Sequence, residues 1–277
     1  MNPEVNPTGP LAGIRVLELG QLLAGPFTAS ILGYFGAEVI KVEPPEGDPI
    51  RRWRVMKDDT SLWWYSLGRN KKSIALDLKS SEGQALVREL AGTCDVLVEN
   101  FRPGVTQKMG IDYESLRALN QRIIYCSITG TGPTGPYKNR PAYDTVGQGL
   151  GGMLSLLMEA DNPRPIGPNY ADSLSGLFAC VGVLGALVAR AQTGQGQRVD
   201  ATMAGSILGF LIAPATSTLA TGSIPGPYSR PRASQTYAFS ASDGLPFAIH
   251  LSSPQKFFEG LCKAVEHPEL IDDPLFH

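Results

Sequence analysis

The feature that most constrains this chain is the alternation of short β-rich runs with segments of helical periodicity over its first 130 residues. Runs such as Ile14–Leu19 and Glu38–Glu43 are rich in branched apolar residues, whereas Phe27–Phe35 between them has apolar residues at helical spacing. Strands that alternate with helices predict a mostly parallel sheet with right-handed crossovers. The predicted fold class is therefore α/β, with a doubly wound, Rossmann-like large domain.

The same pattern extends along the chain and gives bounds for each element. The expected strands cover residues 14–19, 38–43, 73–78, 95–99 and 122–128. The expected helices cover residues 27–35, 80–92 with Ser80 as the N-cap, 111–120, 146–158 and 173–189.

The residues after about Arg230 have a different pattern. Asp243-Gly244 between two β-rich runs, 236–240 and 245–251, predicts a hairpin, and a short amphipathic helix follows at 254–265. We therefore expect a large α/β domain over residues 1–229 and the beginning of a small α+β domain over 230–277, with its remainder missing.

Composition excludes several classes of protein. The 24 Lys+Arg and 26 Asp+Glu give a net charge of −2, which argues against nucleic-acid binding. Four cysteines without a CxxC motif or a Cys/His cluster argue against a zinc site and a disulfide scaffold. The N-terminus has no secretory pattern, so we expect a cytoplasmic protein without a metal site.

One segment, Ser173–Ala189, is almost wholly apolar and contains three glycines. It is marginal for the roughly 18 to 20 residues that a membrane span requires. A buried helix is the favoured interpretation, and we expect no membrane association.

The first glycine loop, Gly20–Pro26, lies between a predicted strand and a predicted helix, and Glu43 ends the next strand. A dinucleotide site places a glycine loop and an acid in similar positions, but the GxGxxG motif is absent. A structural turn is therefore favoured over an NAD site.

Two basic clusters, Arg51–Arg54 and Arg69–Lys72, have aromatic residues close by. Such clusters are usually a solvated charged surface. The alternative is a site for a polyphosphate ligand with an adenine base, because guanidinium groups bind phosphates and stack on bases.

Asp172 precedes the most apolar segment, and two interpretations of it remain open. As a helix N-cap it would accept backbone N–H groups and stay ionised. As a carboxylate nucleophile it would need a rigid position beside an apolar pocket. A histidine-dependent hydrolase is disfavoured, since the histidines lie at 250, 267 and 277 and no GxSxG motif is present.

Several motifs, in order along almost the whole chain, resemble the class III CoA-transferases of the CaiB/BaiF type, the family of formyl-CoA transferase. The motifs are Pro10–Glu18, Ala24–Pro26, Gly36–Glu43, Asn70–Lys79, Val98–Gly104, Tyr143-Asp144, Ala171–Gly176, Thr193–Gln197 and Tyr237–Phe239 with Asp243-Gly244.

The resemblance implies an enzyme that moves CoA from an acyl-CoA donor to a carboxylic acid acceptor. The family's nucleophilic aspartate falls on Asp172, which would form a mixed anhydride and then an aspartyl-CoA thioester. CoA is a substrate, and no other cofactor is implied. The CoA contacts would be Ala24, Leu76, Asp77, Lys79, Asn100, Phe101, Arg102, Lys108, Tyr143 and Asp144. The two basic clusters would then border the CoA site.

The resemblance also implies an interlocked homodimer of longer chains, so this chain is expected to be a fragment. Leu23 stands where formyl-CoA transferase has a glutamine, which argues against oxalate and formate as the substrates. Two alternatives remain. One is an α-methylacyl-CoA racemase, whose basic histidine is replaced here by Tyr143, a poor base at neutral pH. The other is an inactive fragment that binds CoA or a nucleotide.

Overall fold

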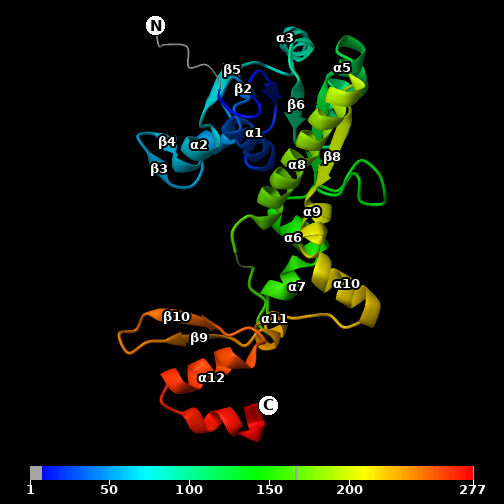
Figure 1. Cartoon of the computed structure of the whole chain (residues 1–277). Coiled ribbons are helices and arrows are strands. Elements are labelled where there is room, and N and C mark those ends of the chain that lie inside the picture. Colours follow the sequence, from blue (N-terminus) through cyan, green and yellow to red (C-terminus); the bar gives the residue numbers. More distant parts are fainter. Residues whose placement is uncertain (1–7, 166, 277) are drawn as a thin grey trace. The chain divides into compact units, whose positions relative to one another are not determined.

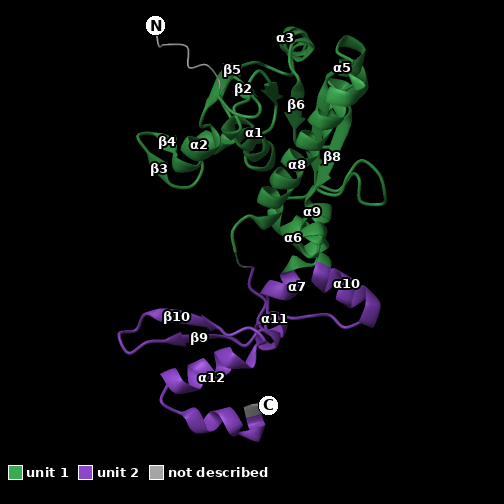
Figure 2. Cartoon of the chain, in the orientation of Figure 1, with its two compact units in different colours: residues 1–153, 167–212 green, residues 154–166, 213–277 purple. Residues whose placement is uncertain are grey.

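The computed structural model describes residues 8–165 and 167–276 (Figure 1). The chain forms two compact units (Figure 2). Unit 1 comprises residues 1–153 and 167–212, and unit 2 comprises residues 154–166 and 213–277. The chain passes between the units at 153–154, 166–167 and 212–213, whereas the sequence pattern placed a single domain boundary at 229–230.

Unit 1 is built on a six-stranded sheet in which every pair of neighbours is parallel. Its order is β5-β2-β1-β6-β7-β8. The strands are β1 Arg15–Glu18, β2 Glu38–Glu43, β5 Lys71–Ala75, β6 Val96–Glu99, β7 Ile124–Thr129 and β8 Arg198–Thr202. This is the doubly wound order of the Rossmann fold, in which the chain runs outward from the sheet centre in both directions. The predicted fold class is confirmed.

Helices cover both faces of this sheet. The helices of unit 1 are α1 Ala24–Tyr34, α2 Leu62–Leu67, α3 Ser81–Gly92, α4 Val105–Lys108, α5 Tyr113–Leu119, α6 Asp144–Leu150, α8 Tyr170–Thr193 and α9 Met203–Phe210. A 3-10 turn, η1 Pro49–Arg52, and a short hairpin of β3 Met56–Lys57 and β4 Thr60–Ser61 complete the unit.

The core lies in two layers, one on each side of the sheet. Val16 of β1 belongs to the layer under α1 and α8, and Leu17 belongs to the layer under α3 and α5. Both side chains are fully buried. Strands covered on both faces need continuous apolar runs, which is why the strand segments show little alternation.

Helix α8 is long and apolar enough to cross a membrane by length and composition, with a mean hydropathy of 1.9. The bent pair of α9 and α10 (Ile212–Thr221) passes the same test when taken together. Helix α8 packs against α1, β7, β8 and α9, and its buried Arg190 pairs with Asp95 at 2.9 Å. One side of α8 thus lies in the core, as the sequence favoured, but only 39% of its apolar stretch is buried, and Leu177, Val181 and Val188 are exposed.

Unit 2 contains short elements. They are most of α7 Met153–Leu157 and α10, then α11 Ser229–Ala233, β9 Thr236–Ser240, β10 Pro246–His250, α12 Gln255–Ala264 and two 3-10 turns, η2 Pro268–Asp272 and η3 Pro274–Phe276. β9 and β10 form the predicted antiparallel hairpin.

The structure differs from the expected elements in a few places. Helix α1 begins at Ala24, three residues before the expected start, so Pro26 lies in its first turn, where a missing N–H costs little. Strand β5 ends at Ala75. Strand β8 and helices α9 and α10 lie in a segment for which the sequence pattern predicted no element.

Candidate active site

The doubly wound sheet reverses direction between β1 and β6, and the carboxyl ends of these two strands mark its switch point. Loops after these two strands diverge to opposite faces, and ligands of open α/β sheets bind at such a point. Here Asn100, after β6, accepts from the backbone N–H of Gln21 at 2.8 Å and donates to its carbonyl at 2.9 Å. The two loops are thus joined at the switch point.

The predicted CoA contacts lie in loops and at helix ends that follow the strands of this sheet. Leu76, Asp77 and Lys79 follow β5; Asn100, Phe101 and Arg102 follow β6; Ala24 begins α1; Lys108 ends α4; Tyr143 and Asp144 begin α6. Ala24 and Leu76 are buried, so only their edges or backbone are accessible. The three cations, Lys79, Arg102 and Lys108, are exposed and available to a polyanion.

A polar cavity of about 250 Å³ adjoins the carboxyl ends of β6 and β7. Phe101 and Arg102 line it, together with Lys138 and Arg198. The sequence did not single out the last two, because they lie far from the basic clusters and are brought here by the loop after β7 and by β8. The buried Glu99 at the base of this cavity has a raised pKa because of its burial.

Asp172 is the third residue of α8, and the N-cap position is held by Asn169. The N-cap interpretation of Asp172 is therefore wrong. Asp144 takes the capping role instead: one of its oxygens accepts from the backbone N–H groups of Ala171 and Asp172, at 2.8 and 3.1 Å. Its other oxygen accepts from Gln148 at 2.5 Å. No sequence pattern pairs these residues, since 28 positions separate Asp144 from Asp172.

The carboxyl group of Asp172 is poorly solvated. Burial, and secondarily the nearby charge of Asp144, raise its pKa to about 7. The expectation that a helix N-terminus keeps it fully ionised is thus corrected: desolvation and a like charge outweigh the helix dipole. Within the described residues, no side chain or backbone group donates a hydrogen bond to its carboxylate oxygens. The group can therefore act as an unshielded nucleophile once it is deprotonated.

A buried ion cluster supports the loop before α1. Lys41 pairs with Glu18 at 2.8 Å and with Asp48 at 2.9 Å, and Lys71 pairs with Glu18 at 2.7 Å. Burial alone would raise the pKa of Glu18, but the two lysines hold it below its usual value. The four side chains are at most 2% exposed.

This cluster also holds the loop backbone. Lys41 donates to the carbonyl of Gly20 at 2.7 Å, and Asp48 accepts from the N–H of Leu22 at 3.2 Å. Leu22 has φ of +63°, a strained conformation for a branched residue that the surrounding bonds must maintain. The cluster therefore fixes the path of the chain into Leu23 and α1.

The basic clusters contain residues that are not free for a ligand. Lys71 is buried in the ion cluster, so the expectation that the whole 69–72 cluster borders the CoA site is wrong for this residue. Arg51 binds Glu43 at 2.6 Å and stacks over Trp64 at 3.5 Å. Burial would raise the pKa of Glu43, but hydrogen bonds from Arg51, the backbone of Asp48 and Ser73 hold it at about 2. Because protein groups already bind both of its oxygens, Glu43 is not free to bind a ribose. This favours a structural turn at Gly20–Pro26 over an NAD site.

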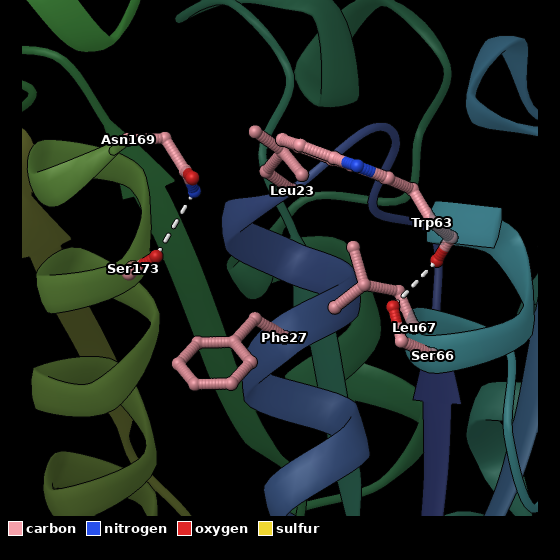
Figure 3. Close-up of a pocket in the computed structure, with 7 residues that line it drawn as sticks. All are labelled: Leu23, Phe27, Trp63, Ser66, Leu67, Asn169 and Ser173. Atoms are coloured by element: carbon pink, nitrogen blue, oxygen red, sulfur yellow. Dashed lines mark hydrogen bonds between the residues drawn. The ribbon is translucent and has the colours of Figure 1, made fainter. Parts of the chain in front are cut away.

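A second cavity of about 250 Å³ lies beside the first turn of α8 (Figure 3). Helix α1 lies between α8 and α2 in this view, and side chains from all three face the cavity. Among the residues that line it, the sequence related Leu23 to substrate choice, Trp63 to a basic cluster and Ser173 to a family motif, but it did not bring them together. The residues are Leu23, Phe27, Trp63, Ser66, Leu67, Asn169 and Ser173.

Comparisons with known proteins show the family of the chain. The sequence model of CoA-transferase family III matches residues 11–277. The chain is 41% identical over 275 residues to succinyl-CoA–D-citramalate CoA-transferase of Chloroflexus aurantiacus. The aligned region covers 98% of this chain and 68% of that protein. It is 38% identical over 279 residues to acetyl-CoA:oxalate CoA-transferase of Acetobacter aceti, covering 98% of this chain and 70% of that protein.

Solved structures show the same similarity. A CaiB/BaiF family protein from Brucella suis superimposes with a TM-score of 0.85 at 38% identity, covering 96% of this chain and 72% of that one. The chain thus spans about two thirds of the length of these relatives, and only about 60% of one succinyl-CoA–L-malate CoA-transferase alpha subunit.

Proposed function

The chain belongs to CoA-transferase family III, and from this premise we propose that it moves CoA from an acyl-CoA to a carboxylic acid through a thioester on Asp172. The observation that carries the proposal is the environment of this carboxyl group. It is partly buried, lacks hydrogen-bond donors among the described residues, and lies in the first turn of α8 beside a cavity. A poorly solvated carboxylate is a better nucleophile than one held by water or by N–H groups.

The reaction proceeds in four balanced steps. The Asp172 carboxylate attacks the carbonyl carbon of the donor thioester, the C–S bond breaks, and CoA leaves as a thiolate. The thiolate attacks the aspartyl carbonyl of the resulting anhydride, which releases the donor acid as a carboxylate. The acceptor carboxylate attacks the carbonyl carbon of the aspartyl thioester, the C–S bond breaks, and CoA thiolate and a second mixed anhydride form. The thiolate then attacks the acceptor carbonyl of this anhydride, which gives the acceptor acyl-CoA and releases the Asp172 carboxylate. Asp172 is regenerated, and nothing is oxidised or reduced.

Other side chains of unit 1 would support these steps. The cations Lys79, Arg102 and Lys108 would hold the CoA phosphates at the carboxyl edge of the sheet. Asp144, by capping α8, fixes the first turn of the helix. Its negative charge also raises the energy of the Asp172 carboxylate, which is relieved when Asp172 becomes a neutral anhydride or thioester.

A homodimer is part of this proposal. Helix α8 exposes Leu177, Val181 and Val188 to solvent, and α9 exposes Leu208 and Phe210 beside it. An apolar surface of this kind favours a partner surface. Some relatives carry the names alpha and beta subunit, so a different chain is the alternative partner. Light scattering of the purified chain distinguishes a dimer of this chain from a monomer that awaits another subunit.

Mass spectrometry tests the chemistry directly. The protein is incubated with acyl-CoA donors, and succinyl-CoA and acetyl-CoA are included because relatives are named for them. Peptide mapping should find CoA on Asp172 or, after treatment with hydroxylamine, the hydroxamate of Asp172. CoA on another residue, or exchange of the α-proton of a branched acyl-CoA in D₂O without CoA transfer, contradicts the proposal; the second result would indicate a racemase.

A further inference from the structure

The cavity beside the first turn of α8 has a composition unlike that of the polar cavity near Arg102. Leu23, Phe27, Trp63 and Leu67 supply its apolar wall. Its polar lining comes from neutral side chains: the Ser66 hydroxyl donates to the carbonyl of Trp63 at 2.9 Å, and the Asn169 amide donates to the Ser173 hydroxyl at 2.9 Å. Of the residues that line this cavity in the described part of the chain, none is charged.

The position of this cavity relates it to the nucleophile. Asn169 and Ser173 line it, and Asp172 lies between them on the same turn of α8. An acyl group joined to the Asp172 carboxyl as an anhydride is therefore within one helical turn of the cavity wall. At about 30 Å³ for each water-sized group, the cavity of about 250 Å³ has room for about eight such groups.

We infer that this cavity receives the non-reacting end of the acyl group and selects acids whose far end is uncharged. The inference rests on the proposed function of Asp172. Each buried methylene group should raise kcat/KM for the donor by about fourfold. A second carboxylate would be buried there without a cation to pair with, which is strongly unfavourable.

The exposed cation Arg54 lies close to one of the lining residues, Trp63. The guanidinium group of Arg54 stacks over Trp53 at 4.8 Å and lies 5.9 Å from the ring centre of Trp63. Arg54 is exposed and does not line the cavity. A rotation of this side chain around the indole of Trp63 would bring a positive charge to the rim, so the experiment must include an Arg54 variant.

A matched pair of donors tests the inference. Succinyl-CoA and 4-methylpentanoyl-CoA have the same number of heavy atoms, and differ in having a carboxylate or an isopropyl group at the far end. The rate at which each donor loads CoA onto the protein is measured by mass spectrometry. We expect 4-methylpentanoyl-CoA to be preferred by at least about 100-fold in kcat/KM. A change in tryptophan fluorescence on addition of 4-methylpentanoate, but not of succinate, that is lost in Trp63→Phe would support the same conclusion without turnover.

A charge variant with a matched control makes the test sharper. Ser66 is exposed at the cavity, so Ser66→Lys should fold and add an ammonium group to the lining. It should shift the preference toward succinyl-CoA by about 100-fold, whereas Ser66→Met, of similar length, should leave the preference unchanged.

The outcomes separate this inference from the proposed function. A wild-type protein that prefers succinyl-CoA overturns the inference alone, and loss of that preference in Arg54→Gln would identify Arg54 as the cation. An unchanged preference in Ser66→Lys also overturns it, because the cavity then does not hold the acyl end. A protein that neither donor loads overturns the proposed function, and this inference with it.

Discussion

The two units of this chain differ most in what they bury. Unit 1 has two apolar layers against a six-stranded sheet, and it also buries a four-residue ion cluster. Among the described residues of unit 2, only Leu251 and Cys262 are buried apolar side chains. The aromatic residues Phe239, Phe247 and Phe257 remain 45 to 49% exposed.

This difference bears on which part of the chain can hold a nucleophile in a fixed position. Every residue proposed to bind CoA or to react belongs to the unit that has its own core. A positioned nucleophile requires a rigid support, and two packed layers provide one. Unit 2, with a two-stranded hairpin and exposed rings, has the features of a segment that gains order from a partner surface.

Replacing Asp172 with Asn should have the largest effect. The amide cannot attack a thioester, so transfer should fall by about 10⁴-fold or more while the fold is retained. The matched control is Asp161→Asn, an exposed carboxylate in unit 2. Steady-state rates and circular dichroism check the result. Comparable losses in both variants would break the assignment of the chemistry to unit 1.

Replacing Lys41 with Met should cost about 3 to 5 kcal/mol in the free energy of unfolding, because it leaves Asp48 and part of the Glu18 charge buried without a partner. The control is Lys263→Met on the exposed face of α12 in unit 2, which should change stability by less than about 0.5 kcal/mol. Urea unfolding measures both. An equal, small effect would show that the ion cluster does not support the loop before α1.

Hydrogen exchange should distinguish the two units directly. Backbone amides in β1 and β6 should exchange at least about 100-fold more slowly than those of β9 and β10, because the hairpin is a two-stranded sheet with exposed side chains. Mass spectrometry of peptic fragments measures this. Equal protection in both regions would show that unit 2 is stable through contacts of its own.

The pH dependence of kcat/KM for the donor should follow the pKa of Asp172, which burial and Asp144 raise to about 7. Only the carboxylate attacks, so kcat/KM for the donor should fall about tenfold for each pH unit below 7 and be flat above it. Glu269→Gln, which alters an exposed pair in unit 2, should leave this profile unchanged. A midpoint near the ordinary value of 3.8 would contradict the described environment.

The ionisation of Asp172 should affect folding stability in the opposite direction: as the pH rises, kcat/KM increases and stability decreases. A raised pKa means that the folded state binds the proton more tightly than the unfolded state. Ionisation of Asp172 therefore reduces stability as the pH rises from about 4 to about 7. The neutral variant Asp172→Asn should be more stable than wild type at pH 8, and this advantage should disappear below about pH 4.

The smallest effects are expected at the CoA phosphates. Arg102→Gln and Lys79→Gln should each raise the KM for acyl-CoA by about tenfold and leave kcat nearly unchanged, because an exposed cation positions the polyanion without taking part in bond making. Arg232→Gln in unit 2 is the control and should change neither constant. A fall in kcat at constant KM would contradict the positioning role.

Much of this protein is determined by local sequence pattern. The periodicity of Glu38–Glu43 and Ser81–Gly92 predicts a strand and a helix with the bounds that the structure has, and Ser80 caps the helix as expected. These features depend on neighbours within four residues, which is the range that such patterns describe. The family was also identifiable, since its motifs are short and occur in a fixed order.

The environment of the site was decided by tertiary structure. Asp144 meets the start of α8 from 28 residues away, and Lys41 and Lys71 meet at Glu18 from different strands. In sequence, Asp172 reads as a helix cap and Lys71 as part of a basic surface cluster. The start of α8 at Tyr170 overturned the first interpretation, and burial overturned the second. The pKa and the accessibility of a charged group depend on what surrounds it in three dimensions. Sequence alone therefore indicated which residue to examine, and the fold determined its protonation and its neighbouring cavity.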